Sequence, residues 1–184
     1  ATKVRKDLID ACPNLKIVAR GGVGMDNIDV EYARSKGIQV INTPNASSRA
    51  VAELAMAHMF SLSRLLHQAN SQMRDDASDF NALKKKYAAG TQLFGKTLGI
   101  VGFGRIGQEL AKMAIGIGMK VIAVDPMLSS VSLKFNLNGN EFSIDLKTAT
   151  MDELLAASDY ISLHVPSSQK PILGTEEMAK MKKG

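Results

Sequence analysis

The sequence predicts an α/β protein built on parallel sheets, and three observations lead to this prediction. Short apolar runs of strand length alternate with helical patterns over nearly the whole chain, as in folds whose parallel strands are joined by helices. One of these runs leads directly into a Gly-x-Gly-x-x-Gly turn followed by a helix, which indicates a Rossmann-type sheet. The 184 residues are 45% hydrophobic and 22% charged, as expected of a globular protein.

The first 44 residues predict two helix–strand pairs. A proline closes the first helix and a glycine ends the second, in keeping with the positions these residues favour. Short apolar runs bounded by turn-forming residues indicate buried strands. The expected elements are a helix at 3–12, a strand at 15–19, a helix at 28–36 and a strand at 38–42.

A long helix is predicted at 49–73, after two serines that suit an N-cap. Its first half is apolar on nearly every side, so it must be covered from several directions. A seam between domains and a subunit interface would both provide such cover, and we expect both. A more polar helix is predicted at 78–89.

The second half of the chain continues the alternation. Residues 98–101, 105–118 and 120–125 form a strand–helix–strand unit long enough for a parallel crossover. A capping box at 150–153 opens a short helix that runs to residue 157. A strand at 160–165 and a helix at 175–182 complete the prediction.

Composition and charge exclude several classes of function. No apolar run reaches the roughly 18–20 residues of a membrane span, and no signal peptide is visible at the start. The single cysteine, Cys12, cannot form an internal disulfide and fits a reducing cytoplasm. The net charge of +5 is spread thinly, and only 5% of the residues are aromatic, so we expect neither nucleic acid nor membrane as a partner. The lysines at 84–86 and 180–183 are interpreted as solvated helix faces.

The turn at 102–107 is predicted to bind the pyrophosphate of a dinucleotide. Gly102 permits the tight turn, Gly104 lets the backbone approach the phosphates, and Gly107 lets helix and strand pack closely. The amides of Arg105 and Ile106 at the helix start favour anions, and the Arg105 side chain adds a cation.

The predicted dinucleotide is NAD. Asp125 ends the next strand 18 residues beyond the turn, where it would accept hydrogen bonds from ribose hydroxyls and repel a 2′-phosphate, which favours NAD over NADP. The alternative interpretation is a strand-to-helix turn with no ligand.

A second glycine-rich turn, Arg20-Gly21-Gly22-Val23-Gly24, also follows a strand and precedes a helix. Its amides would form an anion-binding nest, and Arg20 could hold a carboxylate or phosphate in a bidentate contact. A turn that only reverses the chain explains the local sequence equally well.

Taken together, the motifs resemble the D-isomer-specific 2-hydroxyacid dehydrogenase family. The resemblance extends over nearly the whole chain, in the family's order, at 20–29 (RGGVGMDNID), 40–45 (VINTPN), 51–53 (VAE), 95–107 (GKTLGIVGFGRIG), 151–155 (MDELL) and 163–166 (LHVP). It implies part of a flavodoxin-like substrate-binding domain at 1–44 and an NAD-binding Rossmann domain at 45–184, truncated at its C-terminal end, which together enclose a cleft.

The resemblance also implies roles for individual residues. Arg20, Val23 and Gly24 would bind substrate acid groups. The cofactor would be lined by Arg105, Ile106, Asp125, Val165 and Pro166, besides the glycines of the turn. The helix at 50–66 resembles the segment that forms the family's dimer interface, so we expect a homodimer or a higher homo-oligomer.

No catalytic residue is assigned in this chain, and no metal ligand. The family's catalytic arginine, glutamate and histidine would follow Gly184, and both ends of the sequence look truncated, because a strand is expected before Lys3 and another after the last helix. His164, His58 and His67 are interpreted as structural, and Asp26 and Glu53 as partners of backbone or cap groups.

The expected activity is hydride transfer between NAD(H) and a D-2-hydroxy or 2-oxo acid, with 3-phosphoglycerate on the route to serine as the specific candidate. We expect the 184 residues alone to lack turnover. The alternative is a non-enzymatic, corepressor-like protein that senses NAD on the same fold.

Overall fold

The computed structural model describes residues 2–74, 79–166, 168 and 170–183. The chain divides into two compact units, Ala1–Ser48 and Arg49–Gly184, and each is described separately. None of the helices in the described ranges has the length and apolar character needed to cross a membrane.

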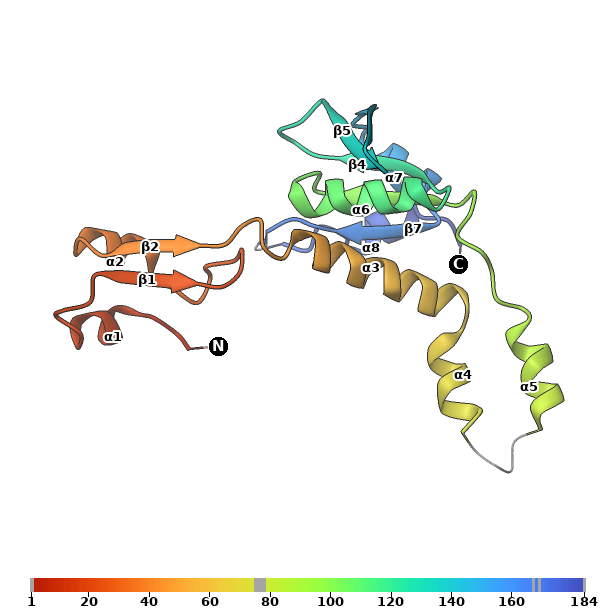
Figure 1. The fold of residues 1–184 in the computed structure, drawn as a ribbon, viewed down its shortest axis with the longest axis horizontal. Coiled ribbons are helices and arrows are strands. Elements are labelled where there is room, and N and C mark those ends of the chain that lie inside the picture. The colour runs from red at the N-terminus through yellow and green to blue at the C-terminus, as the bar shows by residue number, and fades with distance from the viewer. Residues whose placement is uncertain (1, 75–78, 167, 169, 184) are drawn as a thin grey trace. The chain divides into compact units, whose positions relative to one another are not determined.

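The first unit contains a two-stranded parallel sheet (Figure 1). Its small core is formed by Ile9, Ile28, Ala33, Ile38 and Val40. Its elements are α1 (Lys6–Asp10), β1 (Ile17–Arg20), α2 (Val30–Ser35) and β2 (Gln39–Asn42).

The helix predicted at 3–12 is shorter in the structure. Val4 forms a parallel bridge with Ile28, because its amide donates to the Asn27 carbonyl and its carbonyl accepts from the Asp29 amide. These contacts keep the chain extended up to the start of α1.

The second unit has a three-stranded parallel sheet in the order β4-β3-β7. The central strand β3 is almost fully buried, as expected of a parallel strand covered on both faces. Helix α6 packs on β3 and β4 together with buried residues of α3, including Ala52, Met56 and Met59. The strands are β3 (Thr97–Val101), β4 (Lys120–Val124) and β7 (Tyr160–Leu163), and the helices that accompany them are α6 (Arg105–Gly116), α7 (Met151–Ala157) and α8 (Thr175–Ala179).

The predicted long helix is wrong, because it breaks into α3 (Ser48–Ser63) and α4 (Leu66–Gln72). Leu65 adopts a left-handed conformation with φ of 55°. The carbonyl of Ser63 accepts the amide of Thr91 at 2.8 Å and its hydroxyl contacts that of Tyr160 at 3.0 Å. The Ser63 hydroxyl also donates to the Met59 carbonyl of α3. The Ser63 carbonyl, however, is taken by Thr91 rather than by a further turn of the helix, and α3 ends there.

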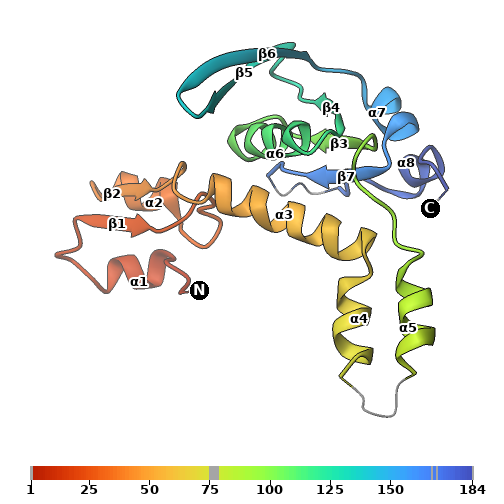
Figure 2. The ribbon, with the colours of Figure 1, turned by 45° about the vertical axis from the view of Figure 1, so that its right-hand side comes forward.

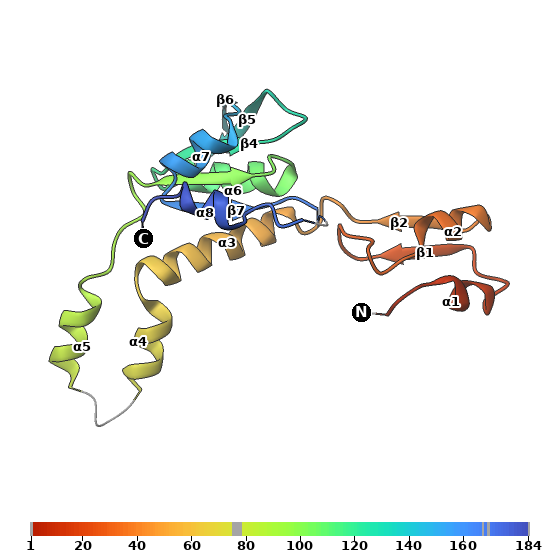
Figure 3. The ribbon, with the colours of Figure 1, turned by 180° about the vertical axis from the view of Figure 1, so that it is seen from behind.

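The helix predicted at 78–89 corresponds to α5 (Phe80–Tyr87), and residue 78 lies outside the described residues. The Asp79 side chain caps α5 by accepting from two amides of its first turn. Figure 3 shows α4 and α5 side by side, and the Tyr87 hydroxyl reaches Gln72 of α4.

A β-hairpin that the sequence analysis did not predict follows β4. Strands β5 (Ser130–Leu137) and β6 (Asn140–Lys147) pair in antiparallel register. Asn138 and Gly139 connect them with φ angles of 52° and 83°, which is a type I′ turn. The alternating apolar face packs through Leu133 into the core formed with α6. Figure 2 shows the two strands of the hairpin, β5 and β6, beside each other.

Two glycine-rich turns as candidate functional sites

The turn at 102–107 begins where two parallel strands end together. Val101 of β3 lies in register with Val124 of β4, and the Gly102 amide donates to the Val124 carbonyl at 2.8 Å. The parallel register therefore places Asp125, the residue after β4, beside the start of the turn.

Gly102 and Gly107 leave no room for a side chain. Gly102 has a φ of 91°, and a Cβ atom there would lie 2.5 Å from the His164 carbonyl oxygen. A Cβ on Gly107 would lie 2.4 Å from the Gly102 carbonyl oxygen. Gly104 differs, since no atom of the described residues lies within 4 Å of its Cβ position. The side of the turn at Gly104 is thus open to a ligand.

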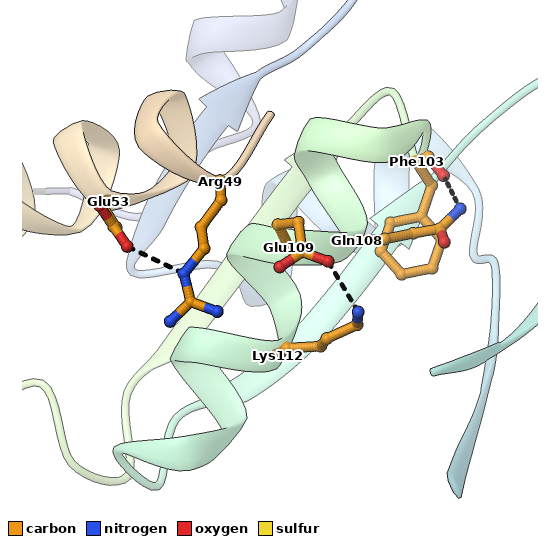
Figure 4. Close-up of polar contacts among 6 residues, drawn as sticks. All are labelled: Arg49, Glu53, Phe103, Gln108, Glu109 and Lys112. Carbon is orange, nitrogen blue, oxygen red and sulfur yellow. Dashed lines mark hydrogen bonds and ion pairs between the residues drawn. The ribbon is translucent and has the colours of Figure 1, made fainter. Parts of the chain in front are cut away.

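Phe103 is held inside the turn by three restraints. Its ring is fully buried, and its amide donates to Asp125 Oδ2 at 2.8 Å. Its carbonyl accepts from the Gln108 side chain at 2.9 Å, and Figure 4 shows this side chain turned back from the first turn of α6. This role of Gln108 was not predicted from the sequence. The pattern that indicates it is an amide side chain one turn into the helix, close enough to donate a hydrogen bond to the preceding loop.

The N-terminus of α6 presents free backbone donors. Gly104 is the N-cap and supplies no side-chain hydrogen bond. The first α-helical bond runs from the Gln108 amide to the Gly104 carbonyl, and the amides of Arg105 and Ile106 have no partner within the described residues. Because these donors add to the positive end of the helix dipole, they favour an anion.

The end of β7 borders the same turn. Val165 Cγ1 lies 2.7 Å from the Cβ position of Gly102, and Pro166 follows it as an exposed residue. The His164 ring is half-buried and contacts the Ser162 hydroxyl at 2.9 Å. Burial lowers the pKa of His164, which favours the neutral ring.

The second glycine-rich turn, in the other unit, is exposed and fixed by hydrogen bonds. The Gly22 amide donates to the Thr43 hydroxyl at 2.9 Å, and the Gly22 carbonyl accepts the Thr43 amide at 3.1 Å. The Asn42 side chain donates to the Val23 carbonyl at 2.8 Å. The residues after β2 thus hold the turn after β1, roles that the sequence analysis did not assign.

Arg20 lies along this turn. Its Nε atom is 3.6 Å from the Cβ position of Gly22, and its guanidinium donates to the Asn27 side chain. The amides of Val23 and Gly24 have no partner among the residues that the structure describes. Asp26 Oδ1 approaches the Cβ position of Gly24 to 3.1 Å, so an anion at this turn depends on the Arg20 charge to offset this carboxylate.

The other candidates from the sequence lie on helix surfaces. His58 on α3 and His67 on α4 are exposed, and Glu53 forms an exposed ion pair with Arg49 at 3.0 Å rather than a backbone contact (Figure 4). In the described parts of the chain, no three His, Cys, Asp or Glu side chains gather in a way that could hold a metal ion.

A family model described as "D-isomer specific 2-hydroxyacid dehydrogenase, NAD binding domain" matches residues 56–184. The chain belongs to this family. The match includes the turn at 102–107, Asp125 and the end of β7, so the second unit carries the NAD-binding domain of the D-2-hydroxyacid dehydrogenases.

Similar proteins support the same assignment. The hydroxypyruvate reductase of Thermotoga maritima is 46% identical over 100% of the chain and 56% of its own length. The D-3-phosphoglycerate dehydrogenase of Methanocaldococcus jannaschii is 42% identical over 99% of the chain and 33% of its own length. The crystal structure of the TT0316 protein from Thermus thermophilus matches with a TM-score of 0.78 and 32% identity, over 99% of this chain and 54% of that one. The chain therefore spans between a third and somewhat over half of the length of these three proteins.

Proposed function

We propose that this chain is part of an enzyme that transfers a hydride between NAD(H) and a D-2-hydroxy or 2-oxo acid. The observation that carries the proposal is the arrangement around the turn at 102–107. Free amides at the start of α6 follow directly after an open glycine, Gly104, and the Asp125 carboxylate lies at the end of the adjacent strand. A pyrophosphate fits the first feature and a ribose fits the second.

The residues around the turn fit NAD. The amides of Arg105 and Ile106 would bind the pyrophosphate, and the Arg105 side chain would add a positive charge. Each oxygen of Asp125 already accepts one amide and keeps a lone pair for a ribose hydroxyl. Val165 and Pro166 would border the bound cofactor. The nicotinamide supplies the hydride chemistry, and the protein binds and orients the two reactants.

The proposed domain assignment follows the two turns. Residues 1–44 would be part of the substrate-binding domain, and residues 45–184 the Rossmann domain. Within the first, the Val23 and Gly24 amides would bind the substrate carboxylate, and Arg20 would neutralise an acid group. The relatives act on hydroxypyruvate or 3-phosphoglycerate by name. We propose 3-phosphoglycerate, in serine biosynthesis, because Arg20 adds a cation suited to a doubly acidic substrate.

We also propose that the protein forms a homodimer or a higher homo-oligomer. One face of α3 is buried in the core of the second unit, whereas Leu54, Phe60 and Leu62 of the same helix are exposed. Burial of these side chains against a second copy would remove apolar area from water. The lone cysteine, Cys12, supports a cytoplasmic location.

The activity is tested on the protein as its gene encodes it. The purified protein is offered hydroxypyruvate, 3-phosphohydroxypyruvate, glyoxylate and pyruvate, and the loss of NADH absorbance is followed. We expect reduction of at least one acid, with the phosphorylated one preferred. If the protein binds NADH but reduces none of a broad set of 2-oxo acids, the proposed activity is wrong.

Arg20→Gln tests the substrate part separately. Loss of a charged hydrogen-bond donor should raise KM for the acid about tenfold or more, while the affinity for NADH, measured by calorimetry, stays unchanged. An unchanged KM would remove Arg20 from the proposed site.

A further inference from the structure

Asp125 is hydrogen-bonded to the glycine-rich turn by the chain's own backbone. Its Oδ2 atom accepts the Phe103 amide at 2.8 Å, and its Oδ1 atom accepts the Met127 amide at 2.8 Å. One carboxylate therefore joins the turn after β3 to the segment after β4.

We propose that Asp125 is a positioning residue that holds the phosphate-binding turn in its binding conformation, in addition to binding the ribose. The ribose contact belongs to the proposed function on which this inference partly rests. The positioning role concerns only the chain itself, so it can be tested without cofactor.

Because Phe103 is buried, its amide depends on the Asp125 carboxylate as a hydrogen-bond acceptor. Phe103 has no exposed surface, so water cannot readily replace a lost partner of its amide. A buried donor without an acceptor is unfavourable, and hydrogen bonds to an ionised acceptor are stronger than neutral ones. Without the Asp125 carboxylate, the turn would have to move until the Phe103 amide reached another acceptor.

Movement of Phe103 would be transmitted to the open part of the turn. Phe103 lies between Gly102, which has no room for a side chain, and Gly104, the N-cap of α6. The Gln108 side chain holds the Phe103 carbonyl from the first turn of the same helix. The position of Phe103 thus sets the direction of the amides of Arg105 and Ile106.

This double role has a consequence for cofactor preference. If Asp125 only repelled a 2′-phosphate, neutralising it would allow NADP to bind. If it also holds the turn, removing its acceptor oxygens disturbs the pyrophosphate site that NAD and NADP share. We therefore expect Asp125→Ala, which leaves no side-chain acceptor, to bind NAD at least about tenfold more weakly and NADP no better than the original protein does.

The deciding experiment is deuterium exchange of the cofactor-free full chain. In Asp125→Ala, which leaves no side-chain acceptor, the Phe103 amide should exchange at least about tenfold faster, while the amides of Ile100 and Val101 in β3 stay protected. Asp145→Ala is the matched control, because it makes the same change on the exposed face of β6 and should leave Phe103 unchanged. Unaltered exchange of Phe103 in Asp125→Ala would overturn the proposal.

A second measurement covers the case in which Asp125→Ala does not fold. In the unsubstituted chain, NMR scalar coupling across the hydrogen bond should connect the Phe103 amide nitrogen with the Asp125 carboxyl carbon. The bond from the Gly102 amide to the Val124 carbonyl, also 2.8 Å long, is the internal standard. Coupling for Gly102 without coupling for Phe103 would overturn the positioning role. Failure of the chain to bind NAD would instead refute the proposed cofactor site, and both tests of the turn would still apply.

Discussion

The two glycine-rich turns look alike in the sequence but differ in what their glycines do. Each turn follows a short strand and precedes a helix. At 102–107, Gly102 and Gly107 are surrounded so closely that a Cβ atom would come within 2.5 Å of backbone oxygen. At 20–24, Gly21 has none of the described atoms within 4 Å of its Cβ position, and hydrogen bonds from residues 42–43 hold the turn.

This difference separates two ways of keeping a ligand-binding turn in place. Close packing fixes Gly102 and Gly107 of the first turn, in addition to the hydrogen bonds that Asp125 and Gln108 make with Phe103, so these two glycines are required by the fold before any ligand binds. Hydrogen bonds from residues 42–43 hold the second turn, and water competes for these polar groups. Substitution of Gly102 or Gly107 should therefore reduce stability much more than substitution in the second turn.

The largest effect is expected for Gly107→Ala. The new methyl group would lie 2.4 Å from the Gly102 carbonyl oxygen, so strand and helix must separate. Overpacking of this kind costs about 2–3 kcal/mol. Urea unfolding, followed at amides of the second unit, should show this loss in the free energy of unfolding.

Gly104→Ala is the matched control within the same turn. Within the part of the chain that the structure describes, nothing lies within 4 Å of its Cβ position, so the free energy of unfolding should change by no more than about 0.5 kcal/mol. NAD affinity should nevertheless fall, because the methyl group stands where the phosphates approach. Equal destabilisation by Gly104→Ala and Gly107→Ala would contradict the packing argument.

The sequence could predict the packed turn because its requirements are local. The strand, the glycine spacing, the helix and the acid at residue 125 lie within about 30 residues, the length of one βαβ unit, and the structure contains β3, α6 and β4 where they were expected. The capping box at Thr150 and Glu153 was predicted for the same reason and is present.

Features that depend on distant partners could not be predicted as well. The break after Ser63 depends on Thr91 and Tyr160, which no local pattern connects with it. The hairpin at 130–147 is a different case, because its Asn138-Gly139 turn between alternating apolar residues is a local signal. It was missed because the strand–helix alternation predicted only parallel strands.

Thr43→Val tests the hydrogen-bonded turn and should have a moderate effect. Valine has the shape of threonine but offers no acceptor to the Gly22 amide. Loss of this bond should cost about 1 kcal/mol, which corresponds to about fivefold faster deuterium exchange of the Gly22 amide. Thr43→Ser, which keeps the hydroxyl, should exchange at the original rate. If Thr43→Val exchanged no faster than Thr43→Ser, the hydroxyl would not hold the turn.

The smallest expected effect is a pH dependence of stability that arises from His164, which lies beside the turn at 102–107. The carbonyl of His164 lies against Gly102, and burial lowers the pKa of its imidazole from the ordinary value of 6.5. The unfolded chain therefore binds a proton more readily than the folded one. It follows that this residue's contribution to stability is complete above about pH 6.5 and falls as the pH drops below that value.

The measurement compares the original chain with His164→Gln at pH 7.5 and pH 5.5, two values chosen to lie about one unit either side of the ordinary histidine pKa. The Tm of the original chain should fall more between these values than that of the variant, because glutamine does not titrate. The pKa values of the Asp159 and Glu153 carboxylates are lowered chiefly by backbone hydrogen bonds. Their contribution to the stability of the fold is therefore lost only at more acid pH and does not mask the difference in Tm. Equal shifts in Tm would mean that the imidazole is as well solvated as in the unfolded chain. In that case only the backbone of His164, and not its side chain, would belong to the close packing around Gly102.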